Sequence, residues 1–210
     1  MTIACIDFET HAIQPRPEYP PKPVGVAIYV EGEEPHYLAW GHPTNNNCTE
    51  DCGRQALTKL LARPNMTFIA HNAPFEGSII EEYFRLDMGW ERWQDTMVQA
   101  FIDNPHGELS LKPLAEQHLG MPPEERDAVK DWLINHGVCR DTKGWGAYIA
   151  YAPGDLVGQY AIGDVVRTRQ LYDFYMARMT PRILAAYHRE MDLMPHILRM
   201  DQRGVRIDAD

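Results

Sequence analysis

Two pairs of polar side chains stand at spacings that place them on one face of a single element. Asp7 and Glu9 are two residues apart at the end of an apolar run, so on a strand both project from the same face. Tyr160 and Asp164 are four apart, so on a helix a phenol and a carboxylate share a face. Carboxylates arranged in this way are typical of Mg²⁺ sites, although each pair alone is more often an ordinary solvated or core feature.

A third carboxylate follows a predicted turn from strand to helix. Residues 67–70 form a short apolar run, after which Asn72 is predicted to cap a helix that has Pro74 in its first turn. Glu76 lies early in that helix, where the helix dipole favours its charge whether or not it does chemistry. A glutamate in the first turn of a helix is ordinary. The functional interpretation therefore depends on finding this glutamate together with the Asp7–Glu9 pair and the Tyr160–Asp164 pair.

The elements that must position these residues follow from hydrophobic periodicity. Apolar runs predict five strands, at 2–8, 24–30, 36–40, 67–70 and 93–97. Helical spacing predicts helices at 55–61, after residue 72, at 109–119, 126–134 and 156–176, and from 183 to about 200. Three strands followed by alternating helices and strands indicate an α/β protein with a mixed sheet. Asp7 and Glu9 then lie at the C-terminal end of a strand, where open α/β sheets place ligands.

Composition excludes several classes of protein. The 210 residues are 44% hydrophobic and 24% charged, which rules out a disordered tail and a disulfide-stapled miniprotein. The net charge of −10 argues against a basic protein that coats nucleic acid, and the negative charge is concentrated in residues 1–166. No apolar run approaches the ~20 residues of a membrane helix, and no secretory signal pattern is present. We therefore expect a soluble, cytoplasmic protein.

Together the patterns resemble the three motifs of the DEDD 3′-5′ exonuclease superfamily, in its tyrosine-bearing branch. Asp7–Thr10 resembles the first motif, His71–Glu76 the second and Tyr160–Val165 the third. The stretch Met200–Asp208 resembles the segment that leads into the polymerase domain of phage-type family A DNA polymerases. The resemblance spans most of the chain.

The resemblance implies a ribonuclease H-like fold, a mixed five-stranded sheet flanked by helices. It implies an exonuclease domain over residues 1–178 and a helical segment over 179–210 that leads toward a polymerase domain absent from this chain. The implied activity is proofreading: removal of nucleoside 5′-monophosphates from the 3′ end of single-stranded or frayed DNA. The implied partners are a DNA 3′ end and a polymerase domain, fused or in trans, with no membrane. The location would be the host cytoplasm if the gene is phage-encoded.

The resemblance also implies a cofactor, two divalent cations, as Mg²⁺ or with Mn²⁺ in its place. Asp7 would bridge both ions, and Glu9 and Asp164 would hold the ion that activates water. Glu76 would help to position the second ion, directly or through water. Tyr160 would orient the attacking water through its hydroxyl.

Five further residues are expected by the same resemblance to bind the substrate strand. Thr10 corresponds to the position where the backbone meets the terminal nucleotide, and Ile13 to an apolar wedge between the last two bases. Asn72 corresponds to an amide that meets the strand, and His71 and Phe75 belong to the same motif. For Ile13 the alternative is an apolar loop residue that packs against the protein.

The second motif departs from the superfamily pattern, because Glu76 stands where aspartate is typical. The extra methylene moves the carboxylate by about one bond length, which matters where sites tolerate only ~0.5 Å. Asp103 is the reserve candidate for the fourth carboxylate, and Asp95 is expected to be structural. The segment 121–145, with its two tryptophans, is expected to cover the sheet rather than to line the path of the strand.

Two other functions remain open on the sequence alone. The tyrosine-bearing branch also contains enzymes that trim RNA, and no motif reports a contact to the 2′-hydroxyl that distinguishes RNA from DNA. A binding module that has lost catalysis through the change at Glu76 is the other alternative. The intact Asp7, Glu9, Tyr160 and Asp164 argue against it.

Overall fold

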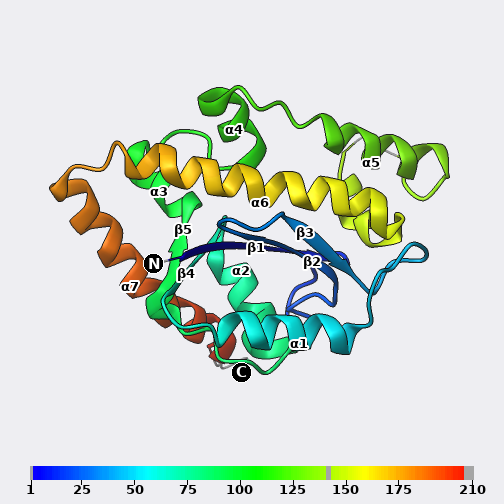
Figure 1. Ribbon diagram of the computed structural model, residues 1–210, viewed down its shortest axis with the longest axis horizontal. Helices are drawn as coiled ribbons and strands as arrows, with labels where there is room; N and C mark the ends of the chain where they lie inside the picture. The colour runs from blue at the N-terminus through cyan, green and yellow to red at the C-terminus, as the bar shows by residue number, and fades with distance from the viewer. Residues whose placement is uncertain (1, 141–142, 206–210) are drawn as a thin grey trace, which may run out of the picture.

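The computed structural model describes residues 2–140 and 143–205, which form one five-stranded mixed sheet with helices on both faces (Figure 1). The strands are β1 (Thr2–Thr10), β2 (Pro23–Val30), β3 (His36–Ala39), β4 (Met66–Ala70) and β5 (Trp93–Asp95). The helices are α1 (Glu50–Leu61), α2 (Ala73–Ser78), α3 (Thr96–Asp103), α4 (Leu111–Leu119), α5 (Glu124–Asn135), α6 (Gly154–Met176) and α7 (Pro181–Arg203). Three short helices complete the chain, η1 (Ile79–Tyr83), η2 (Trp90–Arg92) and η3 (Trp145–Tyr151). The α/β fold with a mixed five-stranded sheet is confirmed.

Strand β1 lies at the centre of the sheet, in the order β3-β2-β1-β4-β5. It pairs antiparallel with β2 from Ala4 to Thr10, with Asp7 opposite Ala27 and an irregularity between Glu9 and Thr10. Its parallel pairing with β4 extends only as far as Cys5, which lies opposite Ile69. The last part of β1, which carries Asp7 and Glu9, therefore has a strand neighbour on one side only.

Alternation along β1 separates two cores. The even-numbered residues Ala4 to Phe8 belong to the core that also contains buried residues of α1, η1 and β4. Cys5 belongs to the second core, which is built with α5 and α6. Because successive side chains of a strand point to opposite faces, Asp7 and Glu9 project toward α6 together with Cys5.

Helix α6 lies across that face of the sheet (Figure 1) and contacts β1, β2, β3 and β4. Its buried stripe consists of Val157, Ala161 and Val165, at intervals of four residues. Tyr160 and Asp164 each precede a residue of this stripe, so they lie at its edge. Packing of the stripe therefore brings a phenol and a carboxylate against the sheet near the end of β1.

Helix α7 packs onto the same body rather than standing apart from it. Tyr187 is buried, and its hydroxyl accepts a hydrogen bond of 2.9 Å from the backbone N–H of Asp95. Met194 and Leu198 are also buried. The stretch Met200–Asp208, for which the sequence analysis noted a resemblance to the segment before a polymerase domain, lies in part outside the described residues, at 206–208. No helix of the described residues is long and apolar enough to cross a membrane.

A buried histidine that the sequence analysis did not single out connects β3 to the start of α6. One ring nitrogen of His42 lies 2.8 Å from the Tyr37 hydroxyl and the other 3.0 Å from the Ala152 carbonyl oxygen. A carbonyl only accepts, so Nδ1 carries the proton and Nε2 accepts from the phenol. Burial lowers the pKa of His42 to about 4, because it takes the charged form of the ring out of water.

We predict that His42 makes folding stability depend on pH between about 6.5 and 4. In this window the unfolded chain binds a proton on this imidazole that the folded chain excludes, so the free energy of unfolding falls as the pH falls. The expected contribution is about 3 kcal/mol over the whole window. Urea denaturation of the protein and of His42→Gln at several pH values measures it. The variant should lose that part of the slope, and equal slopes would contradict the prediction.

Candidate active site

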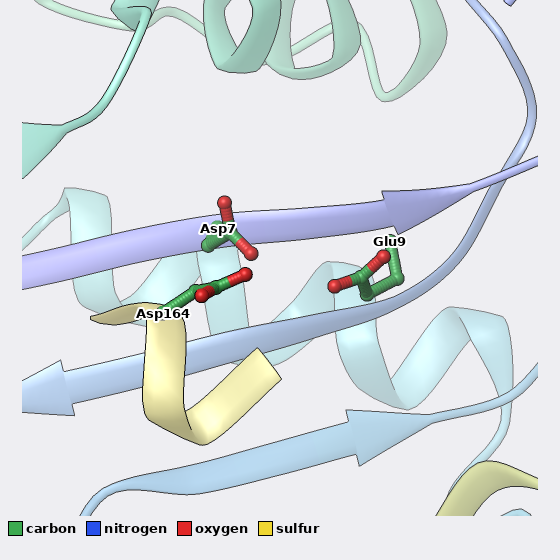
Figure 2. A group of neighbouring side chains, drawn as sticks. All are labelled: Asp7, Glu9 and Asp164. Carbon is green, nitrogen blue, oxygen red and sulfur yellow. The ribbon is translucent and has the colours of Figure 1, made fainter. Parts of the chain in front are cut away.

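Three carboxylates from two distant segments converge at the end of β1. Asp7 and Glu9 come from β1 and Asp164 from α6, and Figure 2 shows their carboxylates turned toward one another. One oxygen of each lies within 4.8 Å of the others. Among the described residues this is the single group of three or more His, Cys, Asp or Glu side chains that could hold a metal ion. Its donors are all oxygens, which suit Mg²⁺ or Mn²⁺ rather than zinc.

The electrostatics of this group also indicate a cation site. Burial and, after it, the neighbouring Asp164 together raise the pKa of Asp7 to about 8. Burial likewise raises the pKa of Glu9, with Asp7 as the largest neighbouring charge. Like charges at such short range in a buried setting favour proton uptake unless a cation is bound. The group therefore has the charge and the geometry that a divalent ion requires.

Glu76 approaches Asp7 from α2 but lies outside the group of three. Its side chain is 2% exposed, and its Oε2 finds no hydrogen-bond partner among the described residues. Burial, followed by the charge of Asp7, raises its pKa well above the ordinary value. A buried carboxylate oxygen without a partner is rare in folded proteins and fits a missing cation or water. The longer side chain at this position thus still faces the site.

Asp103, the reserve candidate for the fourth carboxylate, is placed elsewhere. It ends α3, and its Oδ1 lies 3.9 Å from Nε of Arg178. It lines a separate pocket with Tyr175. The reserve prediction is corrected, because α3 runs away from the end of β1 and carries Asp103 with it.

The turn that presents Glu76 is held by Asp95 rather than by the predicted cap. The Asp95 carboxylate accepts hydrogen bonds from the backbone N–H groups of Asn72 (3.1 Å) and Ala73 (2.7 Å) and, at the start of α3, of Met97 (2.7 Å). Asn72 adopts a left-handed conformation with φ 83°, and its side chain makes no capping bond. Asp95 is structural, as expected, but the predicted capping role of the Asn72 side chain is wrong.

His71 supports the same turn. One ring nitrogen lies 2.8 Å from Oγ1 of Thr96 and the other 2.7 Å from the carbonyl oxygen of Leu109. Both nitrogens are therefore engaged within the protein. These contacts let His71 position the turn, and the substrate contact expected from its motif stays a prediction.

A groove begins at Glu9 and runs past the end of β1. It has a volume of about 360 Å³, within the range of ~300–1,000 Å³ typical of ligand sites. Three of the expected substrate residues line it, Thr10, Ile13 and Phe75. Ile13 is 63% exposed, so it does not pack against the protein. The opposite wall comes from η3, including Gly146 and Ala147, a segment that sequence reasoning treated only as a break.

Tyr160 is held in place by two neighbours. The Trp145 ring meets it edge-on, with ring centroids 5.9 Å apart. Nζ of Lys112, at the start of α4, lies 4.0 Å from the centre of the Tyr160 ring. The same ammonium donates to both oxygens of Asp164, at 2.7 and 2.5 Å. Lys112 thus joins the third motif to α4.

Comparison of the sequence with protein families finds a match to the family described as 3′-5′ exonuclease, over residues 4–180. The chain belongs to this 3′-5′ exonuclease family. Its motifs place it in the DEDD superfamily, as the sequence analysis predicted. A comparison with curated proteins finds no match.

Solved structures share the fold of this exonuclease chain. They include the POL domain of Pol1 from M. smegmatis, in complex with DNA primer-template and dNTP (TM-score 0.61, 16% identity, 99% of this chain and 29% of that one). Escherichia coli RNase D gives a TM-score of 0.58 at 18% identity, covering 97% of this chain and 46% of that one. Brucella melitensis NrnC with bound Mg²⁺ gives a TM-score of 0.59 at 16% identity, covering 99% of this chain and 89% of that one. This chain thus spans less than half of the first two.

Lys112 is the residue of this exonuclease site that sequence reasoning missed. It stands in no motif, and one lysine in the first turn of a helix gives no local signal of chemistry. The fold brings it within hydrogen-bond distance of a carboxylate 52 residues away. Arg167 adds a second cation, 3.5 Å from Asp164. Asp164 is therefore partly neutralised before any metal binds.

We predict that Lys112→Met makes the protein more dependent on metal for stability. Without the ammonium, Asp164 repels Asp7 and Glu9 uncompensated, so the metal-free variant should lose about 2 kcal/mol of stability. The rise in Tm on replacing EDTA by Mg²⁺ should then be larger in the variant than in the wild type. Thermal denaturation under both conditions measures this rise.

Lys130→Met is the matched control, because Lys130 pairs with the half-exposed Asp127 on α5. Its Tm should respond to Mg²⁺ as the wild type does. An identical Mg²⁺-induced rise in Lys112→Met and in the wild type would show that Lys112 does not compensate Asp164.

Proposed function

We propose that this chain removes nucleoside 5′-monophosphates from the 3′ end of single-stranded or frayed DNA, with two divalent cations, as the proofreading part of a family A DNA polymerase. The observation that carries the proposal is the convergence of Asp7, Glu9 and Asp164 within 4.8 Å at the head of a groove. Membership of the 3′-5′ exonuclease family supports it.

The four carboxylates divide between two ions in this proposal. Asp7, Glu9 and Asp164 would hold the ion nearest the attacking water, and Asp7 with Glu76 would hold the second. Bound Mg²⁺ ions supply a water of lowered pKa and neutralise charge on the phosphate and the leaving oxygen. The unpaired Oε2 of Glu76 is the feature of this chain that favours its role as the fourth carboxylate.

Tyr160 would hold the attacking water through its hydroxyl. Burial, and the adjacent Asp164, raise the pKa of this phenol well above its ordinary value, so it keeps its proton at neutral pH. A protonated hydroxyl both donates and accepts a hydrogen bond, which is what orienting a water requires. Trp145 and Lys112 keep the ring in one position for this role.

The substrate strand would enter along the groove. Thr10 and Phe75 line the part nearest the carboxylates and would contact the terminal nucleotide. Ile13, which is exposed, would insert between the last two bases, and Asn72 would approach the strand from the α2 turn. Apolar contacts of this kind accept any base, as proofreading demands.

DNA is the proposed substrate because the matching family is named for DNA polymerase A. The RNase D and NrnC likenesses, at 16–18% identity, concern the fold, so RNA remains an outcome of the test. The chain has a net charge of −10, so few lysines and arginines are available for phosphate contacts. A polymerase domain, fused or bound in trans, would supply the basic surface that this chain lacks.

We predict a ladder of products that shortens from the 3′ end when 5′-labelled single-stranded DNA is incubated with Mg²⁺ or Mn²⁺. EDTA should abolish it, and Asp7→Asn should reduce the rate by more than about 100-fold, since even residues that only support metal ligands contribute about 10- to 100-fold. RNA of equal sequence is the parallel substrate. Intact DNA under every metal condition would refute the catalytic proposal, and faster loss of RNA would reassign the substrate.

A second prediction concerns the departure at position 76. Glu76→Ala should reduce the rate by about 10- to 100-fold, and Glu76→Asp should retain more activity than Glu76→Ala because it keeps the charge. Asp103→Ala is the matched control and should match the wild type, because Asp103 lies away from the site. Single-turnover rates measure all three. Near-normal turnover of Glu76→Ala would remove Glu76 from the set of ligands.

A further inference from the structure

The short helix η3 presents a row of aromatic side chains beside the groove. With three residues per turn, a 3₁₀ helix aligns positions i, i+3 and i+6 along one edge. In η3 these positions are Trp145, Tyr148 and Tyr151. Trp145 turns inward to Tyr160, but Tyr148 and Tyr151 are 41% and 48% exposed. Packing in the core thus accounts for the position of the Trp145 ring, but it does not account for the exposed rings of Tyr148 and Tyr151.

The two exposed rings are continuous with the groove. Tyr148 and Tyr151 have ring centroids 6.5 Å apart. Tyr151 in turn meets the ring of His11 edge-on at 5.7 Å, and His11 lines the groove next to Ile13. We name His11, Tyr148 and Tyr151 the aromatic rim. It extends the apolar surface of the groove away from the carboxylates.

The rim also has a cation beside it. The backbone N–H of His11 donates a 3.0 Å hydrogen bond to the carbonyl oxygen of Lys22, whose side chain is exposed. Aromatic rings next to an exposed ammonium are a combination with which proteins bind single-stranded nucleic acid.

We propose that the aromatic rim binds, by stacking, the unpaired bases that lie on the 5′ side of the last two nucleotides of the substrate. The proposal rests on the proposed function, which places the last two bases at either side of Ile13. The carboxylates repel the phosphates of the strand, so a chain this acidic needs a contact that depends on bases rather than on charge. Stacking meets that need and accepts any sequence.

The first test compares substrates of two lengths. The rim should raise kcat/KM for a tetranucleotide above that for a dinucleotide, because only the tetranucleotide reaches it. In Tyr148→Leu/Tyr151→Leu, which keeps apolar volume without aromatic faces, this ratio should fall about tenfold, mainly through KM. Tyr148→Phe/Tyr151→Phe should restore it. Phe101→Leu is the matched control, since Phe101 is a 44% exposed aromatic that lines a different groove.

The second test does not require catalysis. A DNA tetranucleotide with 2-aminopurine as the third base from its 3′ end is titrated with Asp7→Asn protein in the presence of Mg²⁺. Stacking on the rim should quench its fluorescence, and adding the double leucine change should remove the quenching. If wild-type protein degrades DNA but the double variant changes neither the length ratio nor the quenching, the rim proposal is overturned. If Asp7→Asn protein quenches the fluorescence but wild-type protein does not degrade DNA, the proposed function fails and the rim proposal stands.

Discussion

Four carboxylate side chains lie close together at the end of β1, where burial leaves them little water to screen their repulsion. Burial raises the pKa of each of these carboxyl groups, and the charges of the others add to this at Asp7, Glu9 and Glu76. A fold that gathers such groups opposes part of its own stability, so the surrounding core and nearby cations must offset the repulsion. Lys112 does so within the chain, through both oxygens of Asp164. The carboxylates need more positive charge than Lys112 supplies, and a bound divalent metal would provide it.

A few contacts between residues far apart in the sequence hold these carboxylates in place. Strand β1 loses its β4 neighbour after Cys5, which leaves its acidic end open to the turn before α2. Asp95 accepts backbone hydrogen bonds from the start of both α2 and α3, and its own N–H bonds to Tyr187 of α7. One buried aspartate thus connects three helices to the edge of the sheet, two through its carboxylate and one through its backbone N–H. This junction positions α2, which carries Glu76.

The structure explains part of the negative net charge of the chain. Part of it is the carboxylate group itself, which needs cations before a phosphate can approach. The surface that would meet the strand is apolar and aromatic, with Ile13 and the η3 residues Tyr148 and Tyr151 exposed along it. Attraction through bases rather than phosphates would suit an exonuclease of this net charge.

Local periodicity was sufficient for the five strands, for most of the helices and for the two pairs that carry chemistry, but it missed α3, which begins inside the strand predicted at 93–97. Alternation along β1 places Asp7 and Glu9 on one face, and the helical repeat places Tyr160 with Asp164, because both spacings depend only on neighbouring backbone geometry. The order of the motifs was sufficient for the family, and the mixed α/β sheet followed from the sequence of apolar runs.

What the sequence could not determine are contacts between residues far apart in the chain. It named Glu76 but had to keep Asp103 in reserve, because the positions of these side chains depend on the direction in which α2 and α3 leave the sheet. It assigned the cap of α2 to Asn72, whereas the cap is a carboxylate from the next strand. Lys112 carries no local pattern at all. Such pairings depend on how whole elements pack, and only the tertiary structure decides them.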